Sequence, residues 1–367
     1  MIIRHATIAF ALLAANIVAH AQETFTACAL NVDGLPLKIL GYSLNTGGPG
    51  EEGSYAIGQY LAEKGYDLLA FSEDFNYHDT LMVPLTDTYE AGTHRGALTV
   101  STTSELLAFA NQTLRFDTDG LEFLWKKDGF SATDESWTAW TDCHGYTTDG
   151  ADSLITKGFR YYLVTLPSGF QIDVYTLHME AETTDEDNAC RASQLAQLRD
   201  TLLNNPYTLR PKLIMGDTNC RYTRDDIRGL LIDPLEATSL YTVADAWVQL
   251  CLEGTYPTLG TDALMVESLG YTQGEVVDKI LCVNPLEGDC IEPTDIYFDA
   301  DYDLGDHVPV AVTFNATPSS INQTTTTTPS SPRAGIYAPD GTRRSALAPG
   351  LNIVRQADGT TTKALIR

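Results

Sequence analysis

The stretch from Pro211 to Tyr222 constrains the fold of this chain most, because it joins a buried strand to polar side chains. Its apolar run, Leu213 to Met215, is bounded by a proline and a glycine and predicts a buried strand. Asp217 and Asn219 follow, and residues two apart in an extended chain point to the same side. A carboxylate and an amide on one side suit a hard cation or a phosphate, although an Asx turn at a strand end explains them equally well.

The N-terminus predicts an exported protein. Arg4 precedes an apolar run from Ala6 to Ala15, and small residues follow at Ala19-His20-Ala21. This is the pattern of a secretory signal peptide, with residues 1–21 removed before Gln22. No later stretch has the length needed to span a bilayer. We therefore expect a soluble monomer that is secreted or held at the cell surface or in the periplasm.

Seven cysteines in an exported chain favour disulfide bonds and leave at least one thiol outside them. Cys282 and Cys290 flank a loop that contains proline and glycine, and they are the first predicted pair. Cys190 and Cys220 are the second predicted pair. No Cys-x-x-Cys spacing occurs, so a cysteine zinc site is not expected.

The composition sets the size of the core and the kind of partner. With 367 residues, 43% of them hydrophobic, the chain can bury the core of one large domain or two smaller ones. The net charge of −26 argues against a surface that neutralises long phosphate backbones. A local basic groove on an acidic body would still be compatible with a nuclease.

The first half of the chain predicts two strands that end in polar side chains. The run from Phe25 to Val32 contains Asn31 and is followed by Asp33. The run from Tyr66 to Ser72 is followed directly by Glu73. Two strand ends in the first half therefore carry acids.

The second half repeats this arrangement. Runs from Phe159 to Leu166 and from Phe170 to Leu177 are joined by Pro-Ser-Gly, which predicts a hairpin that ends at His178. The run from Val276 to Val283 predicts another strand and contains Asp278. An acid inside an apolar strand either faces outward or has a buried partner.

The C-terminal part predicts a last strand, a linker and a small tail. Asp306 and His307 precede a strand-like run from Val308 to Phe314. Residues 315–333 are rich in Thr, Ser and Pro and predict a linker. Residues 334–367 contain two Asp-Gly turn signals and predict a small β tail.

The order of these residues resembles the endonuclease/exonuclease/phosphatase superfamily, which includes pancreatic deoxyribonuclease, abasic-site endonucleases, neutral sphingomyelinases and inositol polyphosphate phosphatases. The resemblance runs from about Ala27 to Phe314, so residues 22–314 are assigned to this domain. It implies an α/β fold, a four-layer sandwich of two packed mixed β sheets flanked by helices, with the site at one rim. The tail is similar to the short C-terminal sorting modules of some Bacteroidetes secreted proteins.

The resemblance implies a divalent cation, Mg²⁺ or alternatively Ca²⁺ or Mn²⁺. Glu73 is similar to the metal-binding glutamate of the superfamily, and Asn31 to the asparagine that supports the metal or the phosphate. Asp33 resembles an additional acid of the abasic endonucleases, and Asp306 the acidic neighbour of the catalytic histidine. Oxygen and amide ligands suit Mg²⁺ or Ca²⁺ better than zinc.

The resemblance also assigns catalytic roles. Asp217 and Asn219 are similar to the pair that orients the attacking water and holds the phosphoryl oxygens. His307 resembles the catalytic histidine, and Asp278 the acid that orients it. His178 is expected to protonate the leaving oxygen or to bind the scissile phosphate, with a structural histidine as the alternative. Which group acts as the base stays open.

Four residues are expected to contact the substrate phosphate: Asn31, Asn219, Lys157 and Arg221. Lys157-Gly158 resembles a feature of sphingomyelinases and inositol phosphatases, and Arg221 resembles an inositol phosphatase feature. Each cation suits a phosphate, and a solvated surface charge is the alternative for either one alone.

These residues predict a secreted, divalent-metal-dependent phosphoester hydrolase. The first hypothesis is a phosphodiesterase on phospholipid head groups, similar to sphingomyelinase, or on another small phosphoester. A secreted endonuclease similar to deoxyribonuclease, with nucleic acid as its substrate, is the second hypothesis. An inositol phosphate phosphatase and a non-catalytic exported binding module are the remaining alternatives.

Overall fold

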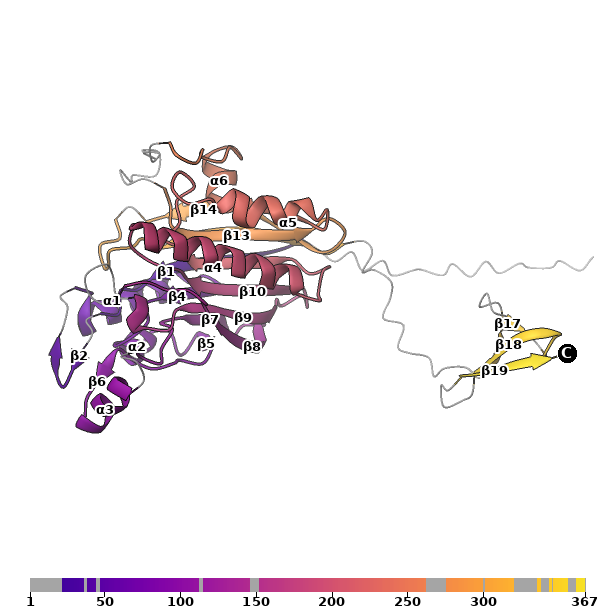
Figure 1. Cartoon of the computed structure of the whole chain (residues 1–367), viewed down its shortest axis with the longest axis horizontal. Helices are drawn as coiled ribbons and strands as arrows, with labels where there is room; N and C mark the ends of the chain where they lie inside the picture. The colour runs from indigo at the N-terminus through magenta and orange to yellow at the C-terminus, as the bar shows by residue number, and fades with distance from the viewer. Residues whose placement is uncertain are drawn as a thin grey trace, which may run out of the picture. The chain divides into compact units, whose positions relative to one another are not determined.

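The computed structural model describes residues 22–35, 38–43, 47–111, 115–145, 152–261, 275–299, 301–319, 335–337, 343–344, 346–355 and 361–366. The predicted signal peptide of residues 1–21 lies outside these ranges, as do residues 320–333 of the predicted linker. The chain divides into two compact units, Met1–Ser319 and Ser320–Arg367 (Figure 1). Among the described residues no helix is both long enough and apolar enough to cross a membrane.

The first unit contains two six-stranded mixed sheets with the strand orders β14-β15-β1-β4-β7-β5 and β12-β13-β11-β10-β9-β8. The strands of the first sheet are β1 (Glu23–Asn31), β4 (Leu68–Ser72), β5 (Tyr89–Ala91), β7 (Glu122–Lys126), β14 (Cys290–Phe298) and β15 (Val310–Thr317). Those of the second sheet are β8 (Ser131–Ala139), β9 (Gly158–Thr165), β10 (Gln171–His178), β11 (Lys212–Asp217), β12 (Tyr241–Asp245) and β13 (Asp278–Pro285). A small sheet joins β2 (Lys38–Ile39), β3 (Tyr42–Ser43) and β6 (Thr99–Val100).

The helices of this unit lie in the connections between strands. They are α1 (Gly50–Lys64), α2 (His78–Met82), α3 (Thr103–Asn111), α4 (Asp185–Asn204), α5 (Asp233–Ala237) and α6 (Ala246–Cys251). A 3₁₀ turn covers Asp152–Leu154, and a π-helical turn covers Arg228–Ile232. Helix α1 ends at Gly65, whose φ of 62° provides the left-handed cap that closes the helix.

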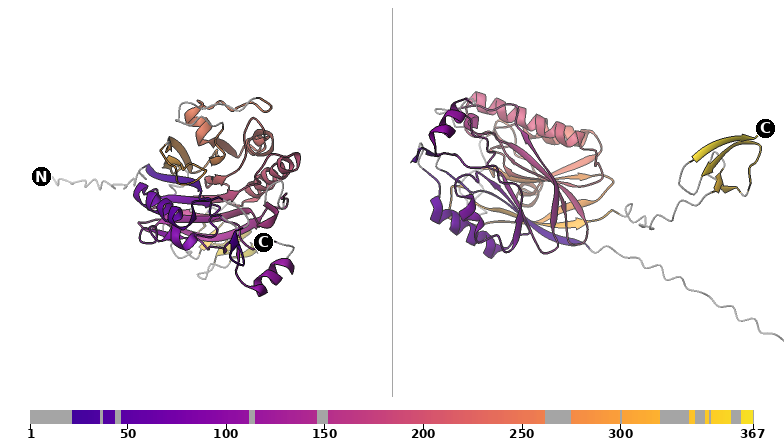
Figure 2. Two further views of the ribbon diagram at one scale, coloured as in Figure 1. Left: turned by 90° about the vertical axis from the view of Figure 1, so that its left-hand side faces the viewer. Right: turned by 90° about the horizontal axis from the view of Figure 1, so that it is seen from below.

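The two large sheets pack face to face around one apolar core. Phe25 and Phe314 of the first sheet stack at 5.1 Å between ring centroids and share a buried cluster with Met215 of the second sheet. Helix α1 covers the outer face of the first sheet, and α4 covers that of the second (Figure 2). These are the four layers of the predicted sandwich, so the predicted fold class is confirmed.

Strand register brings the polar strand ends to one edge. In parallel pairs, Asn31 of β1 lies opposite Ser72 of β4, and His178 of β10 lies opposite Asp217 of β11. Strand β13 runs antiparallel to β11 and places Asp278 opposite Asp217. Because parallel strands end at the same edge, the side chains that follow them gather at one rim of the sandwich.

The predicted linker begins too early. Residues Asn315–Thr317 belong to strand β15, where Asn315 pairs with Thr24 of β1 and Thr317 with Cys290 of β14. Ala316 is buried in the core. The backbone ladder and one buried methyl group hold this segment in the sheet, although its polar composition is typical of a linker.

The predicted disulfide bonds are absent, because all seven cysteines are free. Cys282 lies on β13 of the second sheet and packs in the core between the sheets, whereas Cys290 begins β14 of the first sheet. Cys190 is on helix α4 and Cys220 is buried after β11, where its sulfur lies 3.9 Å from that of Met179. Closeness in sequence did not place the predicted pairs in bonding positions, and the disulfide prediction is wrong for this structure.

The second unit contains a four-stranded antiparallel sheet in the order β17-β16-β18-β19. Its strands are β16 (Gly335–Tyr337), β17 (Arg343–Arg344), β18 (Gly350–Arg355) and β19 (Thr361–Ile366). The fully buried Asn352 side chain accepts hydrogen bonds from Arg344 Nη1 (2.7 Å) and Ala348 N (3.2 Å) and donates to Ala348 O (2.7 Å). One amide therefore joins strand β17 to the segment before β18.

We expect the fold to require glycine at position 216, immediately before the rim. Its φ is 137°, and a Cβ there would lie 2.1 Å from the carbonyl oxygen of Leu177. We expect Gly216→Ala to lower the free energy of unfolding by about 2 to 4 kcal/mol in urea denaturation. Gly169 is the matched control, because its φ is 89° with no atom within 4 Å, and Gly169→Ala should cost only about 1 kcal/mol. Equal losses in the two variants would contradict the steric argument.

Candidate active site

Six polar side chains from both sheets gather at the rim. They come from the ends of β1, β10 and β11, from the residue after β4, from the start of β13 and from the segment before β15. Each side chain is hydrogen-bonded to at least one other member of the group or lies within 4 Å of one. These residues are Asn31, Glu73, His178, Asp217, Asp278 and His307.

The Asp217 carboxylate occupies the centre of this group. Its Oδ2 accepts a hydrogen bond from Asn31 Nδ2 (3.1 Å) and lies 3.5 Å from His178 Nε2 and 3.8 Å from His307 Nε2. Its Oδ1 accepts from the backbone N–H of Asn219 (2.9 Å). Burial opposes ionisation, but the nearby histidines and Lys157 hold the pKa of Asp217 below its usual value.

Glu73 is presented by a turn in an uncommon backbone conformation. Its φ is 57°, and its carbonyl oxygen accepts a hydrogen bond from Gly34 N (2.8 Å). Asn31 Nδ2 donates to Glu73 Oε1 (3.0 Å), so one amide links Glu73 to Asp217. Burial raises the pKa of Glu73 to about 7. A glutamate with a left-handed backbone conformation, between a buried strand and a polar rim, is typical of a functional turn.

The two histidines of the rim have opposite electrostatic environments. His307 Nδ1 lies 2.6 Å from Asp278 Oδ2; burial opposes the charged ring, but the Asp278 and Asp217 carboxylates raise the pKa of His307 to about 11. His178 is 1% exposed, and burial, together with the charge of Lys157, lowers its pKa to about 3. At neutral pH His307 is therefore the imidazolium and His178 the neutral imidazole.

Lys157 lies beneath the rim and not on the surface. Its ammonium group donates to Met179 O (3.0 Å) and pairs with Asp152, and both side chains are buried. Its charge also acts on Glu73 and Asp217. Sequence analysis missed Asp152, because a single acid in a 3₁₀ turn has no spacing that links it to a lysine five residues later.

The remaining predicted residues differ in how closely they are associated with this group. Asn219 donates from Nδ2 to Met179 O (3.4 Å) and has a φ of 50°, which keeps it beside Asp217. Asp33 lies beside Asp306 and His307, and burial, with the Asp306 charge, raises the pKa of Asp33 to about 6. Asp306 itself is exposed. The fourth residue, Arg221, is also exposed, and the described interactions do not bring its side chain into the rim.

The donor atoms of the rim fit a hard divalent cation. Glu73 and Asp217 supply carboxylate oxygens, and Asn31 Nδ2 holds one oxygen of each by a hydrogen bond. Both ring nitrogens of His178 and Oδ1 of Asp278 are buried without a hydrogen-bond partner among the described residues. Unpaired buried polar atoms are costly, so the rim has groups that a bound cation, water or phosphate would satisfy.

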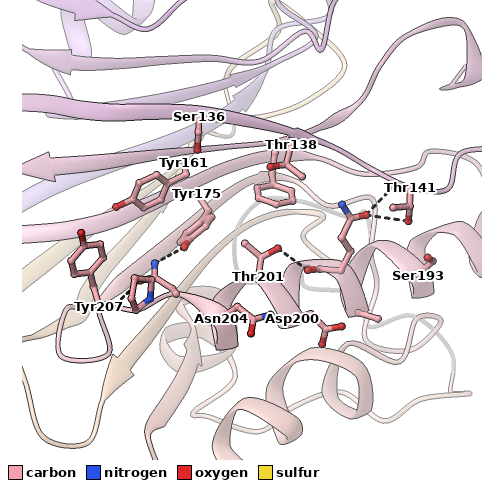
Figure 3. A pocket seen from close by; sticks show the side chains of 15 residues that line it. Ser136, Thr138, Thr141, Tyr161, Tyr175, Ser193, Asp200, Thr201, Asn204 and Tyr207 are labelled. Atoms are coloured by element: carbon pink, nitrogen blue, oxygen red, sulfur yellow. Dashed lines mark hydrogen bonds between the residues drawn. The ribbon is translucent and has the colours of Figure 1, made fainter.

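A separate cavity of about 740 Å³ lies over the outer face of the second sheet, against helix α4 (Figure 3). Its lining combines tyrosines of β9 and β10 with polar side chains of α4, and Asn205 Nδ2 donates to Tyr175 Oη (2.8 Å). No side chain of the rim group lines it. The convergent acids and imidazoles therefore place the candidate site at the rim.

Comparison with known proteins gives local sequence matches to mycobacterial sphingomyelinases and several matches of fold. No protein-family model matches the sequence. A sphingomyelinase of Mycobacterium bovis is 31% identical over 144 residues, which are 38% of this chain and 26% of the relative. The match thus spans about a quarter of the length of the curated relative.

Two solved structures share the fold over most of the first unit. The structure of D. rerio TDP2 complexed with single strand DNA product is 15% identical, covers 80% of this chain and 99% of its own, and has a TM-score of 0.53. An endonuclease/exonuclease/phosphatase from Bacteroides vulgatus is 13% identical, with coverage of 80% and 99% and a TM-score of 0.50. At these identities the likeness establishes the fold.

The charge on His307 is expected to depend on Asp278. His307 has a raised pKa, so its contribution to stability is fully present below pH 6.5 and is lost as the pH rises through about 11. Asp278→Asn should lower the pKa of His307 by about 1 to 3, because it removes the adjacent negative charge. Titration of the imidazole resonances by NMR in metal-free protein measures this change. An unchanged pKa of His307 in Asp278→Asn would contradict the assignment.

Proposed function

Because this chain has the fold of the endonuclease/exonuclease/phosphatase superfamily, we propose that it is a divalent-metal-dependent phosphoester hydrolase. The observation that carries the proposal is the convergence on Asp217 of an amide and two histidines, one of them paired with a second carboxylate. The elements that bring them are far apart in the sequence. Hydrolysis of a phosphate ester needs these groups, namely an acceptor for the proton of water and donors for the phosphoryl oxygens.

Glu73, with Asn31 beside it, would hold the cation, which supplies charge stabilisation to the phosphoryl oxygens. Asp217 is ionised and accepts a proton from the attacking water, whose oxygen bonds to phosphorus as one ester P–O bond breaks. His307 is protonated and gives its proton to the departing alkoxide. His178 is neutral, so it binds a phosphoryl oxygen through its N–H instead of supplying that proton.

A phosphodiester of a phospholipid head group is the proposed substrate. The local sequence identity to a sphingomyelinase supports it. The net charge of −26 also favours a small or membrane-presented phosphoester over long nucleic acid. Lys157 contributes a buried positive charge beside Glu73 and Asp217, which suits a single phosphate group. The proposal also includes export of the chain, through its N-terminal signal pattern, and activity as a monomer.

A nuclease is the second candidate. It is favoured by the fold shared with a TDP2 structure that contains a single strand DNA product. The chemistry at the rim would be the same, and only the surface that binds the rest of the substrate would differ. Hydrolysis of inositol phosphates and binding without turnover are further outcomes that an assay can distinguish.

Replacing His307 tests the catalytic assignment. We expect His307→Ala to lower turnover of the responsive substrate by about 100-fold or more, because the departing oxygen loses its proton donor. His144→Ala is the matched control, since the described hydrogen bond of His144 is made by its backbone N–H. Circular dichroism should show both variants folded. Equal turnover in His307→Ala and the wild type would defeat the assignment.

A substrate panel tests the class of reaction and its metal. Sphingomyelin vesicles, plasmid DNA and inositol phosphates are each incubated with Mg²⁺ and with EDTA. Released phosphocholine, nicked DNA and released phosphate, respectively, are measured. We expect hydrolysis of sphingomyelin that EDTA abolishes, and Glu73→Gln should raise the Mg²⁺ concentration for half-maximal activity about 10-fold or more. Cleavage of plasmid DNA alone would select the nuclease, and activity in excess EDTA would overturn metal dependence.

A further inference from the structure

A second group of metal-ligating side chains lies next to Glu73, outside the candidate active site. Asp74 follows Glu73, His78 begins helix α2, His94 lies in the segment after β5, and Glu122 begins β7. One ligating atom from each of these four residues lies within 4.8 Å of those of the other three. Strands β5 and β4 both pair with β7, so the sheet itself brings three of these segments together.

The four donor atoms are arranged around one point. His78 Nδ1 is 2.6 Å from Asp74 Oδ2 and 3.9 Å from Glu122 Oε2. His94 Nδ1 is 3.9 Å and 3.8 Å from the same two oxygens. The imidazole rings stack at 3.8 Å between centroids, with 15° between their planes, and each Nδ1 lies within 4 Å of both carboxylates. In a tetrahedral zinc site the ligand atoms are about 3.3 Å apart, so His78 and Asp74 would move apart and the other pairs would move closer when an ion binds.

Two of these atoms are buried and lack partners. Glu122 is fully buried, and its Oε2 accepts no hydrogen bond from any described residue. His94 Nδ1 is likewise buried and unpaired among the described residues. Glu122 alternates along β7 with Phe123, which packs between the sheets, and so it faces the helix layer and not the core.

The surrounding structure holds the ligands in place. Asp74 N donates to Gly120 O (2.9 Å), which fixes the backbone at Asp74. The buried Arg160 binds the Asp119 carboxylate through Nε (2.8 Å) and Nη2 (2.7 Å), beside the start of β7. Arg160 Nη1 also donates to Thr93 O (2.5 Å), next to His94. Such outer contacts orient metal ligands before an ion binds.

We propose that Asp74, His78, His94 and Glu122 form a binding site for a transition-metal dication such as Zn²⁺, separate from the cation site at Glu73. Two imidazole nitrogens and two carboxylate oxygens form a donor set that suits Zn²⁺, whereas Mg²⁺ and Ca²⁺ take oxygen ligands. The ion enters between His78 and Asp74 and replaces their direct contact. Because Asp74 follows Glu73 in the chain, the bound ion also fixes the turn that presents Glu73 to the rim.

The test measures metal binding and not activity, so it is independent of the proposed function. Purified chain is stripped with a chelator and titrated with Co²⁺, followed by visible absorption, and with Zn²⁺, followed by calorimetry. We expect one tetrahedral Co²⁺ site without a thiolate charge-transfer band. The Glu73→Gln variant should retain this Co²⁺ site. The double variant His78→Ala/His94→Ala should weaken Zn²⁺ and Co²⁺ binding more than about 100-fold, which is more than the loss of an outer contact causes.

A conservative variant guards against misfolding. Glu122→Gln keeps the shape of the side chain and should also weaken Zn²⁺ binding, while Glu90→Gln on the exposed side of β5 is the matched control and should not. Zn²⁺ should raise the Tm of the wild type and of Glu90→Gln but not that of Glu122→Gln. Unchanged Zn²⁺ binding in Glu122→Gln, or its loss in Glu73→Gln, would overturn the proposal.

Discussion

The burial of the Asp217 carboxylate is the constraint on which the candidate site depends. A buried carboxylate is stable only with donors or positive charge around it, and here Asn31, the Asn219 backbone and the charged imidazole of His307 provide them. These partners lie on different strands of two sheets, so the site exists only when the sheets pack in this register. The site and the fold are thus stabilised by the same contacts.

The turn at Glu73 and Asp74 links two chemically different regions. On one side, Glu73 faces carboxylate and amide donors that suit a hard cation. On the other side, Asp74 faces two histidines and Glu122, a set that suits a softer ion. Glu73 and Asp74 are consecutive in this turn but contact different partners, Asn31 and His78 respectively, so one turn serves both regions.

Much of the fold follows from local patterns. The apolar runs at residues 25–32, 66–72 and 170–177 became β1, β4 and β10 because short buried strands leave a clear signature in sequence. The predicted disulfides and the start of the linker failed because both depend on partners distant in the chain. Cys282 and Cys290 are eight residues apart in sequence but belong to different sheets, and Asn315–Thr317 are held by two neighbouring strands.

The sequence by itself determined which strand ends carry acids, amides and imidazoles, because apolar runs and their flanking residues are local features. Only the tertiary structure decided that Lys157 is buried against Asp152, that the Arg221 side chain is exposed, and that His178 and His307 differ in charge. It alone brought His78 and His94 together over Glu122. The reason is physical: burial and the distance between charges set the pKa and the partner of each group, and both are properties of packed chains.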